Sequence, residues 1–193
     1  MATALRFTTA HLDTIPEDGR RYEIIDGELI VSPQPDLRHQ LVSTGSWEAL
    51  SEWDRQSGAG LAISFPGVIF AEDQAVALDV VWVSRERLAL LLGEDGKLHG
   101  APDLTVEVLS PGLRNEQRDR ETKLTLYSRR GVREYLIVDW QRRQMDVYRR
   151  EELALRHMAT LYPPDVVRSP LLPCFAVPLG QFFQDLPVVT PGP

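Results

Sequence analysis

Two acidic residues interrupt stretches of the sequence that otherwise have the composition of buried strands. Glu107 stands within LTVEVLS, residues 104–110, and Asp79 stands within VALDVVWVS, residues 76–84; neither has a cation beside it. An ionised carboxylate in a strand that is covered on both faces costs free energy unless it is paired or bound to a cation. Because side chains alternate along a strand, the two acids need only face the same edge of a sheet to converge.

Two convergent carboxylates suit a divalent cation. Carboxylates that lie close together repel each other and raise each other's pKa, and a hard cation such as Mg²⁺ relieves this repulsion. For either acid alone, a position at a strand end beside an arginine or in solvent remains an equal alternative. The two acids together favour a metal site.

Lys123 is a third residue whose type suits this chemistry. It is the only lysine of the chain besides Lys97, and it lies in a helix expected to follow the Glu107 strand. In phosphodiester hydrolysis, a lysine near a metal can orient the attacking water and offset phosphate charge. An ordinary position on the helix surface is the alternative interpretation of Lys123.

Hydrophobic periodicity and turn residues indicate the elements that must position these side chains. A hairpin is expected over 20–33 around Asp26-Gly27, and a helix from about 36 to 56 with Asp36 as its N-cap. The crossover from 104–109 through a helix over 115–130 to 134–139 predicts a parallel strand pair. The other expected elements are strands within 61–71, interrupted by Pro66-Gly67, strands over 76–84 and 144–150, a short helix over 85–93, and a loop-like tail from Tyr162.

This order predicts an α/β (α+β) fold, in which helices flank a mixed sheet. The length of 193 residues favours a single domain over 1–193. The one cysteine, Cys174, excludes a disulfide framework and a multi-thiolate zinc site, which suits a reducing cytoplasm. The sequence has neither a signal-like leader nor an apolar run of membrane-spanning length, so we expect a cytoplasmic protein without a membrane span.

The charge of the chain is unevenly distributed. The net charge of -7 argues against a protein that is held to nucleic acid by bulk charge. Residues 114–133 nevertheless contain seven lysines and arginines against three acids. This segment could contact phosphates through a local basic face, and a solvated helix with alternating charges is an equally good interpretation.

Together these segments resemble the Uma-two family of restriction endonuclease-like proteins, within the PD-(D/E)XK nuclease superfamily. The resemblance implies a restriction endonuclease-like core with an N-terminal β-hairpin, whose mixed sheet carries the acids on adjacent strands. It covers nearly the whole chain in the family's order. The matching segments are YEIIDGELIVSPQPDLRHQ (22–40), LDVVWVSRERL (78–88), GAPDLTVEVLSPG (100–112), KLTLYSRRGVREYLIVDW (123–140) and LLPCFAVPLGQFF (171–183).

The resemblance assigns roles to the three residues above. Asp79 is similar to the aspartate of the family's Pro-Asp motif, and Glu107 to the acid of its (D/E)XK motif; both would be catalytic and would bind the metal. Leu78 stands in place of the proline, and Leu109 stands where the superfamily pattern has its lysine. The lysine looks relocated to the following helix, where Lys123 matches its place.

Five further residues are candidates for supporting roles. Glu28 resembles another acidic position of the family, with an exposed hairpin acid as the equal alternative. His39, at the first turn of a predicted helix, is a candidate base or water ligand, although a surface or capping role is commoner there. The substrate-binding candidates are Arg114, Arg118 and Arg120, which would approach the DNA backbone.

The resulting hypothesis is a hydrolase: a Mg²⁺-dependent (or Mn²⁺-dependent) endodeoxyribonuclease that cleaves DNA with a metal-activated water. The alternative is a nuclease-fold module for binding or assembly, with little or no cleavage, linked to a mobile element or a toxin-like system. A hydrolase with its own nucleophile is disfavoured, because the chain has no GxSxG and no HExxH motif. The resemblance also implies a homodimer, since a duplex has two strands to cut.

Overall fold

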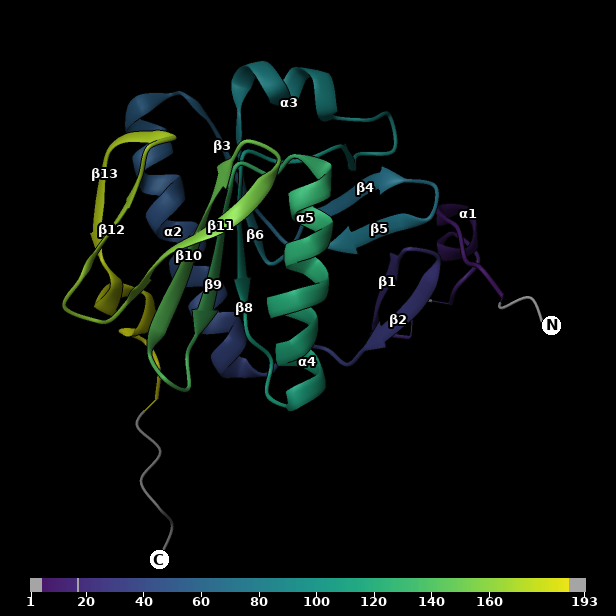
Figure 1. Cartoon of the computed structure of the whole chain (residues 1–193), viewed down its shortest axis with the longest axis horizontal. Coiled ribbons are helices and arrows are strands. Elements are labelled where there is room, and N and C mark those ends of the chain that lie inside the picture. The colour runs from purple at the N-terminus through teal and green to yellow at the C-terminus, as the bar shows by residue number, and fades with distance from the viewer. Residues whose placement is uncertain (1–4, 17, 188–193) are drawn as a thin grey trace, which may run out of the picture.

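The computed structural model describes residues 5–16 and 18–187, except for the side chain of Arg114, and its strands form two sheets and a separate two-stranded ribbon (Figure 1). The larger sheet has the order β11-β10-β9-β8-β6-β3, and the smaller sheet has the order β2-β1-β5-β4-β7. The strands of the larger sheet are β3 (Gly60–Ser64), β6 (Val80–Ser84), β8 (Leu104–Val108), β9 (Glu134–Asp139), β10 (Gln144–Glu151) and β11 (Ala154–Leu161). Those of the smaller sheet are β1 (Arg21–Ile25), β2 (Glu28–Ser32), β4 (Gly67–Ala71), β5 (Gln74–Ala77) and β7 (Leu98–His99), and the ribbon is β12 (Val166–Ser169) with β13 (Leu172–Pro178).

Helices cover both faces of the larger sheet (Figure 1). One face is covered by α2 (Leu37–Ser57), and the other by the consecutive α4 (Leu113–Gln117), π-helix η1 (Arg118–Lys123) and α5 (Leu124–Arg130). The remaining helices are short: α1 (Thr9–Leu12), α3 (Arg85–Leu91) and the 3₁₀ turn η2 (Leu179–Phe183). The mixed α+β architecture predicted from the sequence is therefore confirmed.

The alternation of side chains along the strands builds a core on each face of the larger sheet. Val80 and Trp82 belong to the cluster on the α2 side, whereas Val81 and Val83 belong to the cluster that includes α5 and the smaller sheet. Along β8, Leu104, Val106 and Val108 join the first cluster. Glu107 therefore points to the opposite face, toward α5.

The helix predicted over 36–56 is present as α2, whereas the helix predicted over 115–130 begins earlier, at Leu113, and consists of α4, η1 and α5. The carboxylate of Asp36 caps α2 by accepting a hydrogen bond from the backbone N–H of His39 at 2.9 Å. The helix ends at Gly58, whose φ of +63° is easily adopted only without a β-carbon. The predicted crossover is present as well, since β8 and β9 pair in parallel with Glu107 opposite Ile137.

The predicted continuous strand over 76–84 is wrong. The chain runs in the smaller sheet up to Ala77 as β5, then crosses at Leu78 and Asp79 and enters the larger sheet as β6. The preceding connection between β3 and β4 makes the same crossing, and the N–H of Phe65 donates to the carbonyl of Asp79 at 2.9 Å. Residues 60–84 thus form one long hairpin that is bent across both sheets, with Asp79 at the bend.

The C-terminal part of the chain is more regular than its sequence indicates. Instead of a loop-like tail after a single hairpin, β11 pairs with β10, and β12 with β13. Phe175 and Phe182 of this region are buried in the core cluster on the α2 side. Distant packing partners, which a local pattern does not display, account for these elements. Among the described residues, no helix has the length and apolar character needed to cross a membrane.

Candidate active site

Asp79 is almost completely buried at the bend between the two sheets, and each of its carboxylate oxygens has a partner. Arg21 of β1 donates to Oδ1 at 3.0 Å, and the N–H of Val108 donates to Oδ2 at 2.9 Å. Nε2 of His39 lies 3.1 Å from the same Oδ2. Burial alone would raise the pKa of Asp79, but the His39 hydrogen bond and the charges of His39, Arg21 and Lys123 outweigh it and lower that pKa. The carboxylate is therefore ionised near neutral pH.

The pKa of Glu107 is shifted in the opposite direction, upward. Lys123 Nζ donates to its Oε1 at 3.0 Å, and the hydroxyl of Tyr127 donates to the same oxygen at 2.7 Å. Burial raises the pKa of Glu107 to about 8; the charge of Lys123 opposes this rise, and the nearby Asp79 and Asp119 add to it. The pKa values of these two acids in one pocket are thus shifted in opposite directions, an arrangement typical of acid–base sites.

Lys123 is surrounded by three carboxylates. Its Nζ lies 3.0 Å from Glu107, 3.5 Å from Glu23 and 3.6 Å from Asp119. Burial favours the neutral amine, but the charges of these three acids outweigh it and raise the pKa of Lys123. The group is therefore an ammonium near neutral pH, with a charge and hydrogen-bond donors to offer rather than a basic nitrogen.

The π-helix η1 determines which side chains join Lys123. In a regular α-helix, residues five positions apart point about 140° away from each other. In a π-helix, five residues complete slightly more than one turn, so Arg118 and Lys123 project from nearly the same side. Asp119 lies with them, 3.5 Å from Arg118 Nε, and its Oδ1 is buried without a hydrogen-bond donor among the described residues.

These residues line a narrow pocket with a volume of about 20 Å³, which is room for one particle of the size of a water molecule or an ion. Its wall contains four carboxylates against the two guanidinium groups and the ammonium of Arg21, Arg118 and Lys123. Within the described part of the chain, no group of three or more His, Cys, Asp or Glu side chains has an arrangement that could hold a metal ion. A metal here would rely on two carboxylates and water. The lining residues are Arg21, Glu23, Ser32, Pro33, Pro35, His39, Asp79, Glu107, Val108, Ser110, Arg118, Asp119 and Lys123.

Most of the residues selected from the sequence meet in this pocket. Asp79, Glu107 and Lys123 lie together, His39 contacts Asp79, and Arg118 lines the pocket.

Three candidates do not reach it. Glu28 is exposed on β2 and lines a separate hollow beside Arg118. Arg120 pairs with Glu116 and Asp146, outside the pocket. Arg114 has its side chain outside the described part of the structure.

Sequence reasoning missed Arg21, Glu23 and Asp119. Glu23 carries the same signal as Glu107, an acid within an apolar strand, in RYEII of β1. Asp119 stands four residues before Lys123, a spacing that places both on one side of a regular helix. Arg21 shows no local signal, because its partner Asp79 lies 58 positions along the chain.

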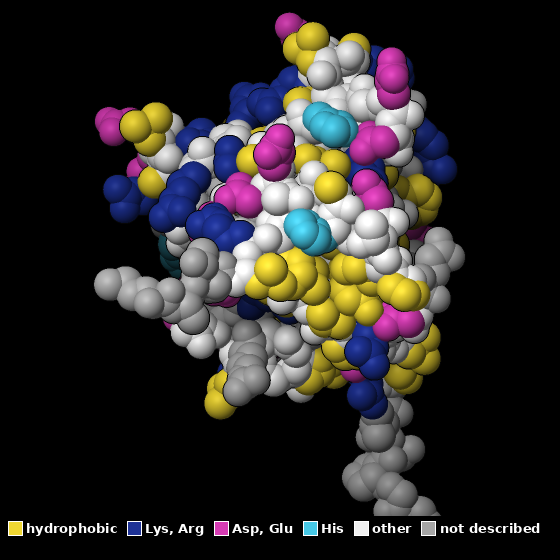
Figure 2. All heavy atoms as spheres, turned by 90° about the vertical axis from the view of Figure 1, so that its right-hand side faces the viewer, with side chains coloured by type: hydrophobic (Ala, Val, Ile, Leu, Met, Phe, Trp, Pro, Cys, Tyr) yellow, Lys and Arg dark blue, Asp and Glu magenta, His cyan; other side chains and the backbone are white. Residues whose placement is uncertain are grey.

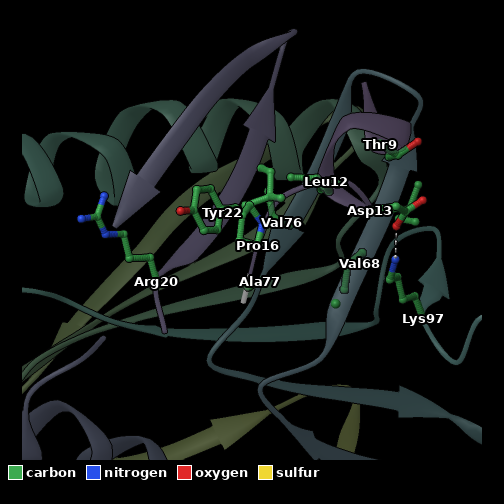
Figure 3. Close-up of a pocket in the computed structure, with 14 residues that line it drawn as sticks. Thr9, Leu12, Asp13, Pro16, Arg20, Tyr22, Val68, Val76, Ala77 and Lys97 are labelled. Atoms are coloured by element: carbon green, nitrogen blue, oxygen red, sulfur yellow. Dashed lines mark ion pairs between the residues drawn. The ribbon is translucent and has the colours of Figure 1, made fainter. Parts of the chain in front are cut away.

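A second pocket lies between α1 with its following residues and the smaller sheet (Figure 3). Its walls are mainly apolar, with Leu12, Tyr22 and Val76 pointing inward, and Lys97 lies 3.8 Å from Asp13 at its edge. Figure 2 shows hydrophobic side chains gathered on this face of the molecule. Among its described lining residues there is no pair of facing carboxylates, so the chemistry described above belongs to the other pocket.

The mixed sheet with flanking helices, with Glu107 on β8 of its parallel pair and Asp79 just before β6, is a nuclease-like fold. The chain belongs to the Uma2 family, which is described as "Putative restriction endonuclease" and whose model matches residues 9–180. The fold is shared with the crystal structure of "a putative nuclease belonging to DUF820" from Anabaena variabilis, at 18% sequence identity and a TM-score of 0.72. That match covers 92% of this chain and 97% of the other. No match was found among curated proteins. The resemblance inferred from the sequence is thereby confirmed.

Proposed function

We propose that the protein is a metal-dependent endonuclease that hydrolyses phosphodiester bonds of DNA in the pocket around Asp79 and Glu107. The observation that carries this proposal is the convergence of an ionised Asp79, a Glu107 of raised pKa and the ammonium of Lys123 on one narrow space. The three residues come from the sheet crossing, from β8 and from η1. The description of the family points to the same class of reaction.

The donor set of the pocket fits a hard divalent cation such as Mg²⁺ or Mn²⁺. Both hydrogen bonds to Glu107 fall on Oε1, so among the described residues Oε2 accepts none. Asp119 Oδ1 is likewise buried without a hydrogen-bond donor among the described residues, although Arg118 Nε and Lys123 Nζ lie 3.5 and 3.6 Å from it. Mg²⁺ is commonly held by one or two carboxylates together with water and substrate phosphate, and Asp79 and Glu107 would be those ligands.

The side chains of the pocket would divide the remaining work. A bound Mg²⁺ or Mn²⁺ would supply the activation of water and the neutralisation of phosphate charge. Lys123 would donate to the attacking water or to a phosphate oxygen, and its charge favours the more negative transition state. Arg21 and Arg118, at the wall of the pocket, would bind and orient the phosphate through charged donors.

Plasmid cleavage tests this proposal. We expect the wild type to nick or linearise supercoiled DNA with Mg²⁺ or Mn²⁺, and Asp79→Asn and Lys123→Met to lower the rate at least about a hundredfold. Glu134→Gln is the matched control, because Glu134 is equally buried but pairs with Arg149 outside the pocket.

Equal cleavage by the wild type and both site variants would refute the assignment of the pocket. DNA binding by a wild type that never cleaves would favour the alternative, a binding or assembly module. Circular dichroism and thermal unfolding of each variant separate loss of chemistry from loss of fold.

A further inference from the structure

The catalytic pocket is the centre of a longer depression. Arg21 and Pro35 line both this pocket and a neighbouring hollow, which we name the side pocket. On the other side, Arg118 lines both the catalytic pocket and the hollow beside the β1–β2 hairpin. The side pocket has a volume of about 330 Å³, which is in the range of small-ligand sites. It is lined by Arg21, Gln34, Pro35, Gln40, Phe65 and Ala77.

Phe65 is the unusual residue of the side pocket. Its side chain is a large hydrophobic group that remains 48% exposed. Its backbone has a φ of +52°, in the left-handed region, where a bulky residue is rarely found. Strained backbone of this kind is concentrated at functional sites. Core packing does not explain why a phenylalanine stands here, because its ring faces solvent at the bend where the hairpin crosses between the sheets.

Phe65 is also tied directly to the catalytic pocket. Its N–H donates to the carbonyl of Asp79 at 2.9 Å, so the backbones of the two residues lie side by side where the hairpin crosses between the sheets. Arg21 bridges the two pockets, with its guanidinium on Asp79 Oδ1 and its side chain in the wall of both. A ligand that places an anionic group at Arg21 would therefore extend toward the ring.

The remaining lining is polar in a way that suits a nucleobase. Gln34 and Gln40 are exposed on the rim, and a side-chain amide offers both donors and an acceptor to a base edge. The amide of Gln40 makes one long contact, 3.5 Å to the carbonyl of Pro35. An aromatic platform, amides and a phosphate-binding arginine are the components of a nucleotide subsite on single strands.

We infer that the side pocket binds one unpaired nucleobase, stacked on Phe65, of the nucleotide adjacent to the phosphate bound at the mouth of the catalytic pocket. The substrate class is then DNA that is single-stranded or locally unpaired at this position, because a base within an intact duplex stack cannot reach the ring. This inference rests on the proposed function, since it places the scissile phosphate between Arg21 and Arg118.

Binding of labelled oligonucleotides in the presence of EDTA tests the inference without cleavage. Phe65→Asn removes the ring and keeps a residue that tolerates left-handed backbone, whereas Phe65→Tyr retains the platform. We expect Phe65→Asn to weaken binding of a single strand roughly five- to a hundredfold, with Phe65→Tyr within about twofold of the wild type. Tyr162→Ala, at an exposed aromatic outside these pockets, is the matched control.

A single abasic site, moved along the strand, identifies the contact. At one position it should weaken wild-type binding by the same factor as Phe65→Asn, with no further effect in that variant. A fully paired duplex should bind more weakly than the single strand and should respond little to Phe65→Asn. Thermal unfolding confirms that each variant is folded.

The inference is overturned if folded Phe65→Asn binds the single strand as tightly as the wild type, if the abasic effect is additive, or if the wild type binds no single strand. The result is independent of cleavage. A stacking effect in a protein that cuts neither plasmid nor single-stranded DNA with Mg²⁺ or Mn²⁺ would refute the endonuclease proposal and support the base subsite. Cleavage of DNA together with unchanged binding by Phe65→Asn would support the endonuclease proposal and overturn the base subsite.

Discussion

Lys123 Nζ lies 3.0 Å from Glu107 Oε1, and both side chains are about 97% shielded from solvent although they stand sixteen positions apart in the chain. The pair joins η1 to β8, and Glu23 and Asp119 complete the ring of carboxylates around the ammonium. A buried ion pair of this kind contributes little net stability, whereas removing one partner is strongly destabilising. The site is consequently sensitive to single substitutions.

Replacing Lys123 by Met should lower the free energy of unfolding by about 3–5 kcal/mol, because three buried carboxylates lose their shared cation. Urea unfolding monitored by circular dichroism measures this loss. Lys97→Met is the control, since Lys97 is 41% exposed and its surface ion pairs contribute at most about 1 kcal/mol. A Lys123→Met variant as stable as Lys97→Met would contradict the described charge arrangement.

Removing only the hydroxyl of Tyr127 should have a smaller effect. Tyr127→Phe deletes the 2.7 Å hydrogen bond to Glu107 Oε1, and hydrogen bonds to charged groups contribute about 1.5–3 kcal/mol. The same urea titration should show a decrease of this size, together with slower plasmid cleavage. The comparison is Tyr148→Phe, at a half-buried tyrosine outside the pocket, which should remain within about 0.5 kcal/mol of the wild type.

The N-cap of α2 should matter for both stability and the site. Asp36→Ala removes the acceptor for the N–H of His39 and should cost about 1 kcal/mol of unfolding free energy. Asp36→Ser retains a capping oxygen and should recover most of it. Because His39 reaches Asp79 from this first helical turn, cleavage should fall with Asp36→Ala and return with Asp36→Ser. Identical behaviour of the two variants would exclude a capping role.

Acid should destabilise the protein partly through Asp146. Burial raises its pKa, but hydrogen bonds from Arg120 and Thr160 outweigh burial, and the pKa falls below the ordinary 3.8. A depressed carboxyl pKa contributes stability that is present above the unfolded-state pKa and lost as pH falls through the folded-state value. Urea midpoints measured from pH 6 down to pH 3 should therefore fall less steeply for Asp146→Asn than for the wild type. Parallel curves would disprove the assignment.

Metal binding should raise the thermal stability of the protein. If Asp79 and Glu107 bind Mg²⁺ or Mn²⁺ only in the native state, millimolar metal should raise the melting temperature of the wild type. Glu107→Gln should abolish that increase, and Glu134→Gln should leave it unchanged. Differential scanning calorimetry with and without EDTA provides the measurement. An equal increase in all three proteins would mean that metal binds elsewhere.

The sequence predicted those features whose cause is local. Asp36 and Gly58 have the residue types of helix ends, Asp26-Gly27 has that of a hairpin turn, and the apolar runs around Glu107 mark a buried strand. Glu107 and Asp79 drew attention because an acid among apolar residues needs a distant partner. That argument is chemical, so it required no knowledge of which elements pack together.

The features that were missed depend on distant contacts. The apolar run on either side of Asp79 is continuous, and only the pairing of its two halves with different sheets shows that the chain bends there. Arg21 meets Asp79 because the hairpin packs beside that bend. The π-helix changes the angular spacing of Arg118 and Lys123, which a pattern based on regular helices misplaces. Glu28 was favoured over Glu23, although it is Glu23 that faces inward from its strand.

The position of Asp79 between the sheets makes the pocket dependent on both of them. Arg21 and Glu23 belong to the smaller sheet, Glu107 to the larger, and Lys123 to η1 in the connection between β8 and β9. A chain in which the smaller sheet has not formed lacks the contacts of Arg21 with Asp79 and of Glu23 with Lys123. The charged groups of the pocket are therefore brought together only when both sheets are in place.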